Sequence, residues 1–171
     1  LPNTPMVVVF DTAFHQTMEE EVYLYPVPYE WYTKYAVRRY GAHGTSHKYV
    51  SMRANEILDN EDARLITCHI GNGASISAVT SMGLTPNAGL MMGTRCGDID
   101  ATILPYIMEE TGMSAKEMDT ALNKQSGLLG ISGVSSDSRD IEDGINNGDE
   151  RCILAQKMYV KRIVDFIAKY Y

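Results

Sequence analysis

With 171 residues, the chain is long enough for one substantial domain, or for one domain and part of another. Its net charge of −7 argues against nucleic-acid binding, which calls for a basic face. No apolar run approaches the roughly 20 residues that a membrane-spanning helix needs. Cys68, Cys96 and Cys152 lack metal-binding or redox spacing, so we expect a cytoplasmic protein in which all three are reduced, buried small side chains.

The first third of the chain alternates apolar and proline-rich segments. The apolar run Met6–Phe10 predicts a strand that is buried on both faces. The tyrosine-rich stretch 23–35 contains two prolines and should therefore form no regular helix. A helix is then predicted over residues 45–58, with Thr45 or Ser46 as its N-cap.

The remainder predicts a mixture of strands and helices. Residues 64–70 and 76–79 have the apolar, β-branched character of strands. Helical patterns follow over 101–110, 115–124 and 150–170. Strands that alternate with loops and helices, with glycine-rich turns after the strands, indicate an α/β fold.

The glycine-rich turn Gly71-Asn72-Gly73 follows the strand predicted over 64–70. Glycines at such a place let successive backbone N–H groups converge on an anion, and phosphate is the expected ligand. Asn-Gly is also the strongest short signal for a β-hairpin turn. The two interpretations are equally supported, and they are compatible.

Several other polar residues lie where ligands commonly bind. Asp11 follows a predicted strand end, where a carboxylate can orient a metal ion or a nucleophile, or can simply cap a turn. Arg95 lies in a tight glycine loop and can clamp a phosphate or anchor the loop. All four histidines lie beside these motifs, and this placement suggests a shared polar cleft, while each one alone is more often a hydrogen-bonded structural histidine: His15, His43, His47 and His69.

Taken together, five segments resemble the acetate kinase family, and they occur in the family's order. They cover essentially the whole chain and resemble, in turn, the family's catalytic-aspartate stretch, histidine segment, phosphate loop, catalytic-arginine loop and nucleotide segment. These segments are Val9–Met18, Tyr40–His47, His69–Ser75, Met92–Asp98 and Gly133–Asp140.

The resemblance implies the actin-like, ribonuclease H-like ATPase fold, in which two α/β domains close over ATP. Residues 1–12 would end the first domain, and residues 13–171 would form most of the second, catalytic domain. Family segments that would precede and follow this chain are absent from it, including metal-binding residues. We therefore expect no metal ligands within the chain, and no activity from residues 1–171 in isolation.

The resemblance also implies a reaction, phosphoryl transfer between ATP and acetate with Mg²⁺, and a homodimer. In the family's pattern Asp11, His43 and Arg95 would be catalytic. The other implied site residues are His69, Ile70, Gly71, Asn72 and Gly73 for ATP phosphates, Asp137, Ser138 and Arg139 for adenosine, and Pro86 with Ala42 for the acyl pocket.

Two alternatives to an acetate kinase stay open at this point. A propionate or butyrate kinase of the same superfamily would share these motifs, because one methylene changes discrimination by only about 1–3 kcal/mol. A catalytically incomplete fragment that binds nucleotide or mediates dimerisation is the other alternative, because phosphoryl transfer needs all participating groups held in one cleft.

Overall fold

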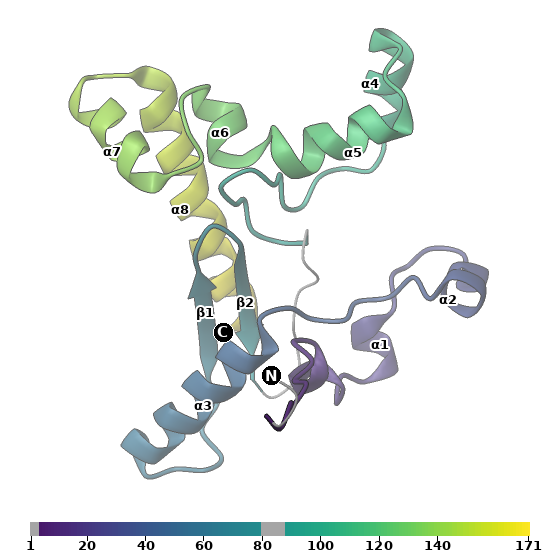
Figure 1. Cartoon of the computed structure of the whole chain (residues 1–171), viewed down its shortest axis with the longest axis vertical. Coiled ribbons are helices and arrows are strands. Elements are labelled where there is room, and N and C mark those ends of the chain that lie inside the picture. The colour runs from purple at the N-terminus through teal and green to yellow at the C-terminus, as the bar shows by residue number, and fades with distance from the viewer. Residues whose placement is uncertain (1–3, 80–87) are drawn as a thin grey trace. The chain divides into compact units, whose positions relative to one another are not determined.

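The computed structural model describes residues 4–79 and 88–171 (Figure 1). The chain divides into two compact units, each of which is described by itself. The first comprises Leu1–His69 and Ser77–Thr85, and the second comprises Ile70–Ile76 and Pro86–Tyr171. The division falls within the hairpin formed by strands β1 (Ile66–Ile70) and β2 (Ala74–Ala78).

The first unit is built around one long helix. A short 3₁₀ turn, η1 (Ala13–His15), packs against α3 (Gly44–Leu58), while α1 (Glu20–Tyr23) and α2 (Tyr29–Tyr35) lie between them in the chain. The predicted helix 45–58 is confirmed, but its predicted cap is wrong. The N-cap is His43, which has a left-handed backbone conformation with φ of +53°. Its backbone N–H donates a hydrogen bond to the Asp11 carboxylate, which holds this conformation.

The hairpin confirms two predicted strands and the turn between them. The N–H of Gly71 donates to the carbonyl of Gly73 at 3.0 Å, which closes the turn. Along β2, Ser75, Ile76 and Ser77 are all fully buried. This strand is therefore a core element despite its serines.

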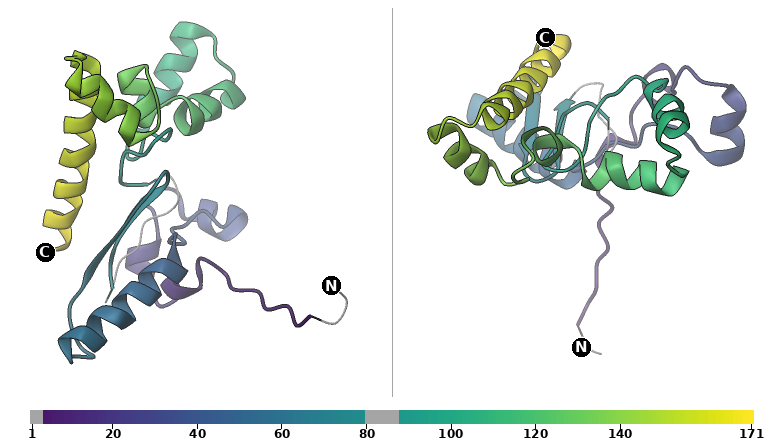
Figure 2. Two further views of the ribbon diagram at one scale, coloured as in Figure 1. Left: turned by 60° about the vertical axis from the view of Figure 1, so that its left-hand side comes forward. Right: turned by 90° about the horizontal axis from the view of Figure 1, so that it is seen from above.

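The second unit is helical apart from its part of the hairpin. It contains α4 (Ile103–Thr111), α5 (Ala115–Lys124), α6 (Gly127–Ser132), α7 (Ser138–Asn146) and α8 (Glu150–Tyr170). Helices α6 and α7 pack on the first half of α8 (Figure 2). Their shared core consists of apolar side chains that are almost fully buried: Met91, Leu128, Ile141, Cys152 and Ala155.

Side-chain caps mark where three helices of the second unit begin, namely α5, α7 and α8. Ser114 and Glu117 form a reciprocal capping box at the start of α5. Asp137 accepts from the Arg139 N–H to start α7, and Asp149 accepts from two N–H groups at the start of α8. Such caps are worth about 1 kcal/mol each. The predicted helices over 101–110, 115–124 and 150–170 are confirmed.

The predicted buried strand Met6–Phe10 is wrong. These residues form no strand, and their side chains are 70–91% exposed. Apolar, β-branched residues favour a strand, but a strand also needs a neighbour with which to exchange backbone hydrogen bonds. In the described part of the chain, only β1 and β2 pair.

The expectation of no helix over residues 23–35 is also wrong. Helix α2 starts directly after Pro28, a position at which the missing N–H of proline costs nothing. Arginines stack on the neighbouring tyrosines, with Cζ of Arg38 lying 3.8 Å from the ring centroid of Tyr23 and Cζ of Arg39 lying 5.0 Å from that of Tyr25. These cation–π contacts stabilise the proline-containing segment.

The cysteines are free thiols, but they do not share one environment. Cys152 is buried as expected, Cys96 is half-buried, and Cys68 is exposed on β1. The prediction that all three are buried is therefore wrong for Cys68. In the described residues, no helix combines the length and apolar character needed to cross a membrane.

Candidate active site

Asp11 and His43 are joined through the backbone at the start of α3. The His43 N–H donates to Oδ2 of Asp11 at 2.6 Å, and the Gly44 N–H donates to the Asp11 carbonyl at 2.8 Å. A Cβ at Gly44 would collide with that same carbonyl, so only glycine permits this approach. Two residues that are 32 positions apart in sequence thus form one rigid corner.

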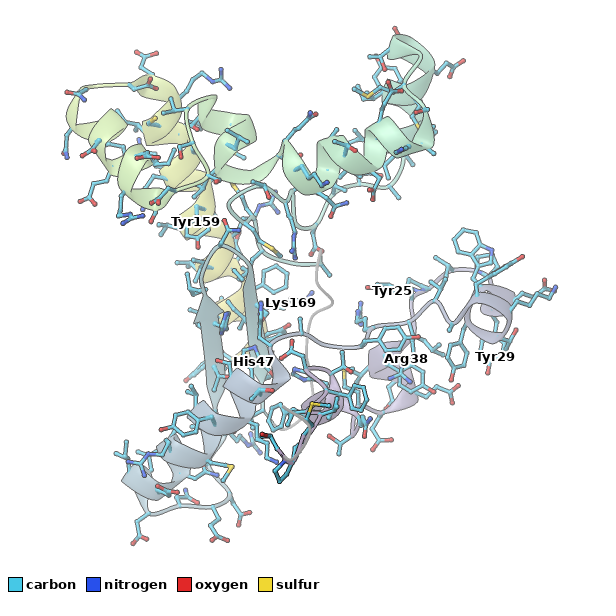
Figure 3. All side chains as sticks on the ribbon, in the orientation of Figure 1. Tyr25, Tyr29, Arg38, His47, Tyr159 and Lys169 are labelled. Atoms are coloured by element: carbon cyan, nitrogen blue, oxygen red, sulfur yellow. The ribbon has the colours of Figure 1, made fainter. Side chains whose placement is uncertain are left out.

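Three histidine rings, those of His43, His69 and His47, contact one another next to the hydrogen bond between Asp11 and His43. The rings of His43 and His69 stack with centroids 3.9 Å apart and 19° between their planes. Nδ1 of His69 lies 2.9 Å from the Ser46 hydroxyl. His47, which lies on α3 in Figure 3, is bonded through Nδ1 to the Thr67 hydroxyl at 2.7 Å. The histidines therefore lie together within the first compact unit, as a packed cluster of rings.

The cluster is completed by His15, which lies edge-on to His47 with ring centroids 5.8 Å apart. Burial lowers the pKa of His15. The pKa of His47 falls to about 4, first because burial penalises its charged form, then because His15, His43 and His69 repel a positive charge there. His47 is only 1% exposed, so it is a neutral, buried ring at pH 7.

We expect the buried His47 to make stability depend on pH. Between pH 6.5 and about 4, the unfolded chain protonates this residue while the native chain does not, so the free energy of unfolding decreases as pH falls. The loss from this one residue is about 3 kcal/mol across that window. Urea unfolding of the protein from pH 7 to pH 4 measures it.

The matched variant is His47→Asn, which keeps a polar partner for the Thr67 hydroxyl. The slope of unfolding free energy against pH should become shallower in this variant, although His15 still contributes. An identical slope in the variant and the wild type would show that His47 is not the titrating group.

A pocket of about 520 Å³ lies within the second unit, inside the size range of small-molecule sites. The glycine-rich turn and the start of α7 line it together, and the Gly93 N–H donates to the Asn72 carbonyl at 3.3 Å. A Cβ at Gly93 would lie 2.6 Å from Oδ1 of Asn72, so glycine is needed to keep this wall compact. The pocket is lined by Ile70, Gly71, Asn72, Gly93, Leu128, Ser136, Asp137, Ser138 and Tyr159.

The carboxylate of Asp137 lies at one side of this pocket and is held by Arg139. The Arg139 side chain donates to both carboxylate oxygens, with Nη2 at 2.5 Å from Oδ2. These hydrogen bonds lower the pKa of Asp137 to about 2. The carboxylate therefore remains an anionic acceptor throughout the neutral range. Its negative charge favours hydroxyl donors over phosphate at that side.

Arg95 belongs to a loop of the second unit that is fixed on both sides. The Thr94 carbonyl accepts from Ser126 N–H at 3.0 Å, and the Cys96 N–H donates to the Leu122 carbonyl at 3.1 Å. The Thr94 hydroxyl also donates to the Asn123 carbonyl at 3.0 Å. The backbone on either side of Arg95 is thus anchored to the end of α5 and the start of α6. Its guanidinium is carried by a rigid loop.

Comparison with known proteins agrees with these observations. The family model described as the acetokinase family matches residues 1–171. The chain belongs to the acetokinase family. It is 58% identical to acetate kinase from Clostridioides difficile (strain 630) and 57% identical to acetate kinase from Bacillus subtilis (strain 168). Each match covers 99% of this chain and 45% of the relative, so the chain spans about half the length of these curated relatives.

Solved structures give the same result for this acetokinase chain. Acetate kinase from Porphyromonas gingivalis matches with a TM-score of 0.90 at 53% identity, over 95% of this chain and 43% of that one. A propionate kinase from Francisella tularensis matches with a TM-score of 0.93 at 48% identity, over 99% and 46%. The predicted fold class, the α/β fold of these kinases, is confirmed.

The predicted site residues of this acetokinase chain fall into two groups. Asp11, His43 and His69 lie in the first unit, where Ala42 is also buried and its carbonyl lies 3.2 Å from Nε2 of His15. The second unit carries Arg95 and the pocket. Among the predicted nucleotide residues, those that line the pocket are Ile70, Gly71, Asn72, Asp137 and Ser138.

The remaining predicted residues have other positions. Gly73 closes the hairpin turn, and Arg139 does not line the pocket but donates hydrogen bonds to Asp137, which does. Pro86 lies outside the described residues. Within residues 4–79 and 88–171, no group of three or more His, Cys, Asp or Glu side chains could hold a metal ion.

Sequence reasoning did not identify Tyr159 and Leu128 as pocket residues. Tyr159 lies on α8 and faces the pocket, and burial raises its pKa (Figure 3). In the sequence, both residues occupy positions that are typical of the apolar face of an amphipathic helix. Their role in the wall follows from the packing of α6 on α8, for which the sequence carries no local signal.

Proposed function

We propose that the intact protein transfers a phosphoryl group between ATP and acetate, giving acetyl phosphate and ADP. The observation that carries this proposal is the single pocket lined by both the Gly71-Asn72 turn and the start of α7 at Asp137-Ser138. These segments lie more than 60 residues apart in the sequence, and the family resemblance assigns them independently to phosphate and to adenosine.

Different parts of the pocket lining suit different parts of a nucleotide. Backbone N–H groups of a glycine turn can approach phosphate oxygens closely. The Asp137 carboxylate suits ribose hydroxyls, which donate hydrogen bonds that a carboxylate accepts. Leu128 and Tyr159 offer apolar surface against which a base can pack. The residues present therefore fit ATP or ADP.

The chemistry requires an oxygen of the acetate carboxylate to bond the γ-phosphorus of ATP while the bond to the β–γ bridging oxygen breaks and ADP leaves. Charge on the transferring phosphoryl group must be met by fixed donors. In this proposal His43 and Arg95 donate to its equatorial oxygens. Asp11 orients the carboxylate or the metal-bound phosphate.

Magnesium would enter this site with the nucleotide. Mg²⁺ usually keeps several waters and takes one or two carboxylates together with substrate phosphates. Asp11 of the first unit is proposed to orient the phosphate that carries the ion, and the carboxylate ligands of the ion are expected from parts of the intact protein outside this chain. When bound, the ion supplies positive charge that neutralises phosphate oxygens.

The acyl preference is the prediction that tests this function. We expect kcat/KM to be highest with acetate, lower with propionate and lowest with butyrate, because each added methylene must fit a small pocket. Acyl-hydroxamate formation from ATP and each carboxylate measures it. The propionate kinase neighbour, at 48% identity, makes propionate the second candidate substrate. A maximum with propionate would contradict the proposal in favour of that relative's activity, and a maximum with butyrate would contradict both.

Three further expectations remain proposals: a homodimer, a cytoplasmic location, and a division of the chain after residue 12 into parts of two domains. We also propose that residues 1–171 alone are inactive, because the chain spans about 45% of the length of its relatives. Positioning of both substrates by one closed cleft is what phosphoryl transfer requires.

A further inference from the structure

The ring of His43 is stacked on the ring of His69. The two rings are stacked nearly parallel with centroids 3.9 Å apart. His43 precedes α3 in a left-handed backbone conformation, whereas His69 lies near the end of β1. A rotation of the His69 ring out of its present plane would therefore remove the flat surface against which the His43 ring is stacked.

One hydroxyl fixes the His69 ring in turn. Nδ1 of His69 lies 2.9 Å from the hydroxyl of Ser46, in the first turn of α3. The outer torsion of a histidine side chain is soft and allows its two ring orientations to interchange. A bond to Nδ1 fixes the plane of the ring and selects one of its two orientations, and it couples the protonation of Nδ1 to the direction in which the Ser46 hydroxyl donates.

The remaining neighbours of His69 do not replace this bond. His47 lies edge-on to it with ring centroids 6.5 Å apart, and its own Nδ1 is engaged by Thr67. An edge contact at that distance limits the space around the ring but does not distinguish its two nitrogens. Of the contacts described for the His69 ring, the Ser46 hydroxyl is the one that acts on a nitrogen.

We propose that Ser46 is a positioning residue: through its hydrogen bond to His69 it holds His43 in the orientation used for phosphoryl transfer. The catalytic part of this inference rests on the proposed function. Ser46 acts through the ring of His69 and then the ring of His43, and it is not itself assigned a contact with substrate.

The test compares three variants of the intact protein. Ser46→Ala should lower kcat about tenfold, because a misplaced donor loses transition-state stabilisation. The KM values for ATP and acetate should stay within about twofold, since uniform binding is unaffected. Ser46→Thr keeps the hydroxyl and should restore most of the activity. Ser51→Ala is the matched control, because Ser51 is on the same helix, is buried, and donates only to the Lys48 carbonyl at 2.9 Å.

A second readout is independent of activity. Nitrogen-15 NMR of labelled histidine rings should show an altered protonation pattern for His69 in Ser46→Ala, and an unchanged one in Ser51→Ala. The inference is overturned if Ser46→Ala keeps the wild-type kcat, if Ser51→Ala loses as much, or if His69 gives the same spectrum in every variant. A wild-type protein that forms no acetyl phosphate refutes the proposed function instead, and the NMR comparison still decides whether Ser46 orients His69.

Discussion

Replacement of Asp11 by asparagine is expected to lower kcat for acetyl phosphate formation about 1,000-fold. Asparagine has nearly the same shape and can still accept the hydrogen bond that the His43 N–H donates at 2.6 Å. The corner between Asp11 and α3 should therefore survive, and only the negative charge is lost. A carboxylate that orients a metal-bound phosphate or the acyl substrate cannot be replaced by a neutral amide.

Asp100→Asn is the matched control for this experiment. Asp100 is also exposed, and its Oδ1 accepts from the N–H and the hydroxyl of Thr102 in a turn before α4. This substitution should leave kcat within about twofold of wild type, as expected for a surface change away from a site. Thermal unfolding should confirm that both variants remain folded. A kcat for Asp11→Asn within tenfold of wild type would remove Asp11 from the catalytic groups.

Replacement of Arg95 by alanine should lower kcat between about 100- and 1,000-fold, the usual loss when one fixed donor to a developing charge is removed. The loop that carries Arg95 is anchored through Thr94 and Cys96, neither of which needs the arginine side chain. We therefore expect the loop to keep its conformation in the variant. Steady-state kinetics with saturating ATP and acetate give the measurement.

Two further variants show whether geometry or charge matters at this position. Arg95→Lys should recover only part of the loss, because an ammonium group cannot donate two parallel hydrogen bonds as a guanidinium does. Arg53→Ala removes an exposed arginine of α3 that pairs with Glu56, and should have no effect on kcat. Full activity of Arg95→Lys would mean that positive charge alone is required.

The secondary structure that could be predicted from the sequence is the part that depends on local signals. Helices α5 and α8 begin at capping residues, Ser114 and Asp149, which act within three positions in the chain. The turn at Gly71-Asn72-Gly73 carries its own hairpin signal. The apolar run Met6–Phe10 failed as a strand because strand formation depends on a pairing neighbour, which a local pattern does not supply.

In the candidate site, too, the sequence predicted the features that have local signals and missed those that depend on distant contacts. The motif at Asp11 and the one at His43 were both identified from the sequence, but their direct hydrogen bond was not. That contact needs a glycine at position 44 and a left-handed His43, and the sequence pattern there favoured a helix cap at Thr45 or Ser46 instead. Likewise Tyr159 reaches the pocket through packing of α8, which depends on long-range contacts. Residues whose function depends on a distant neighbour are those that sequence patterns identify least well.

The most direct test of the proposed function is phosphorus-31 NMR of the intact protein mixed with ATP, acetate and Mg²⁺. The proposal predicts that an acetyl phosphate signal appears while ATP is converted to ADP, until the two directions of the reaction balance, and that Asp11→Asn greatly slows this exchange. Conversion of ATP to ADP and inorganic phosphate alone, with no acetyl phosphate signal and with no acetylhydroxamate formed when hydroxylamine is added as a trap, would contradict it.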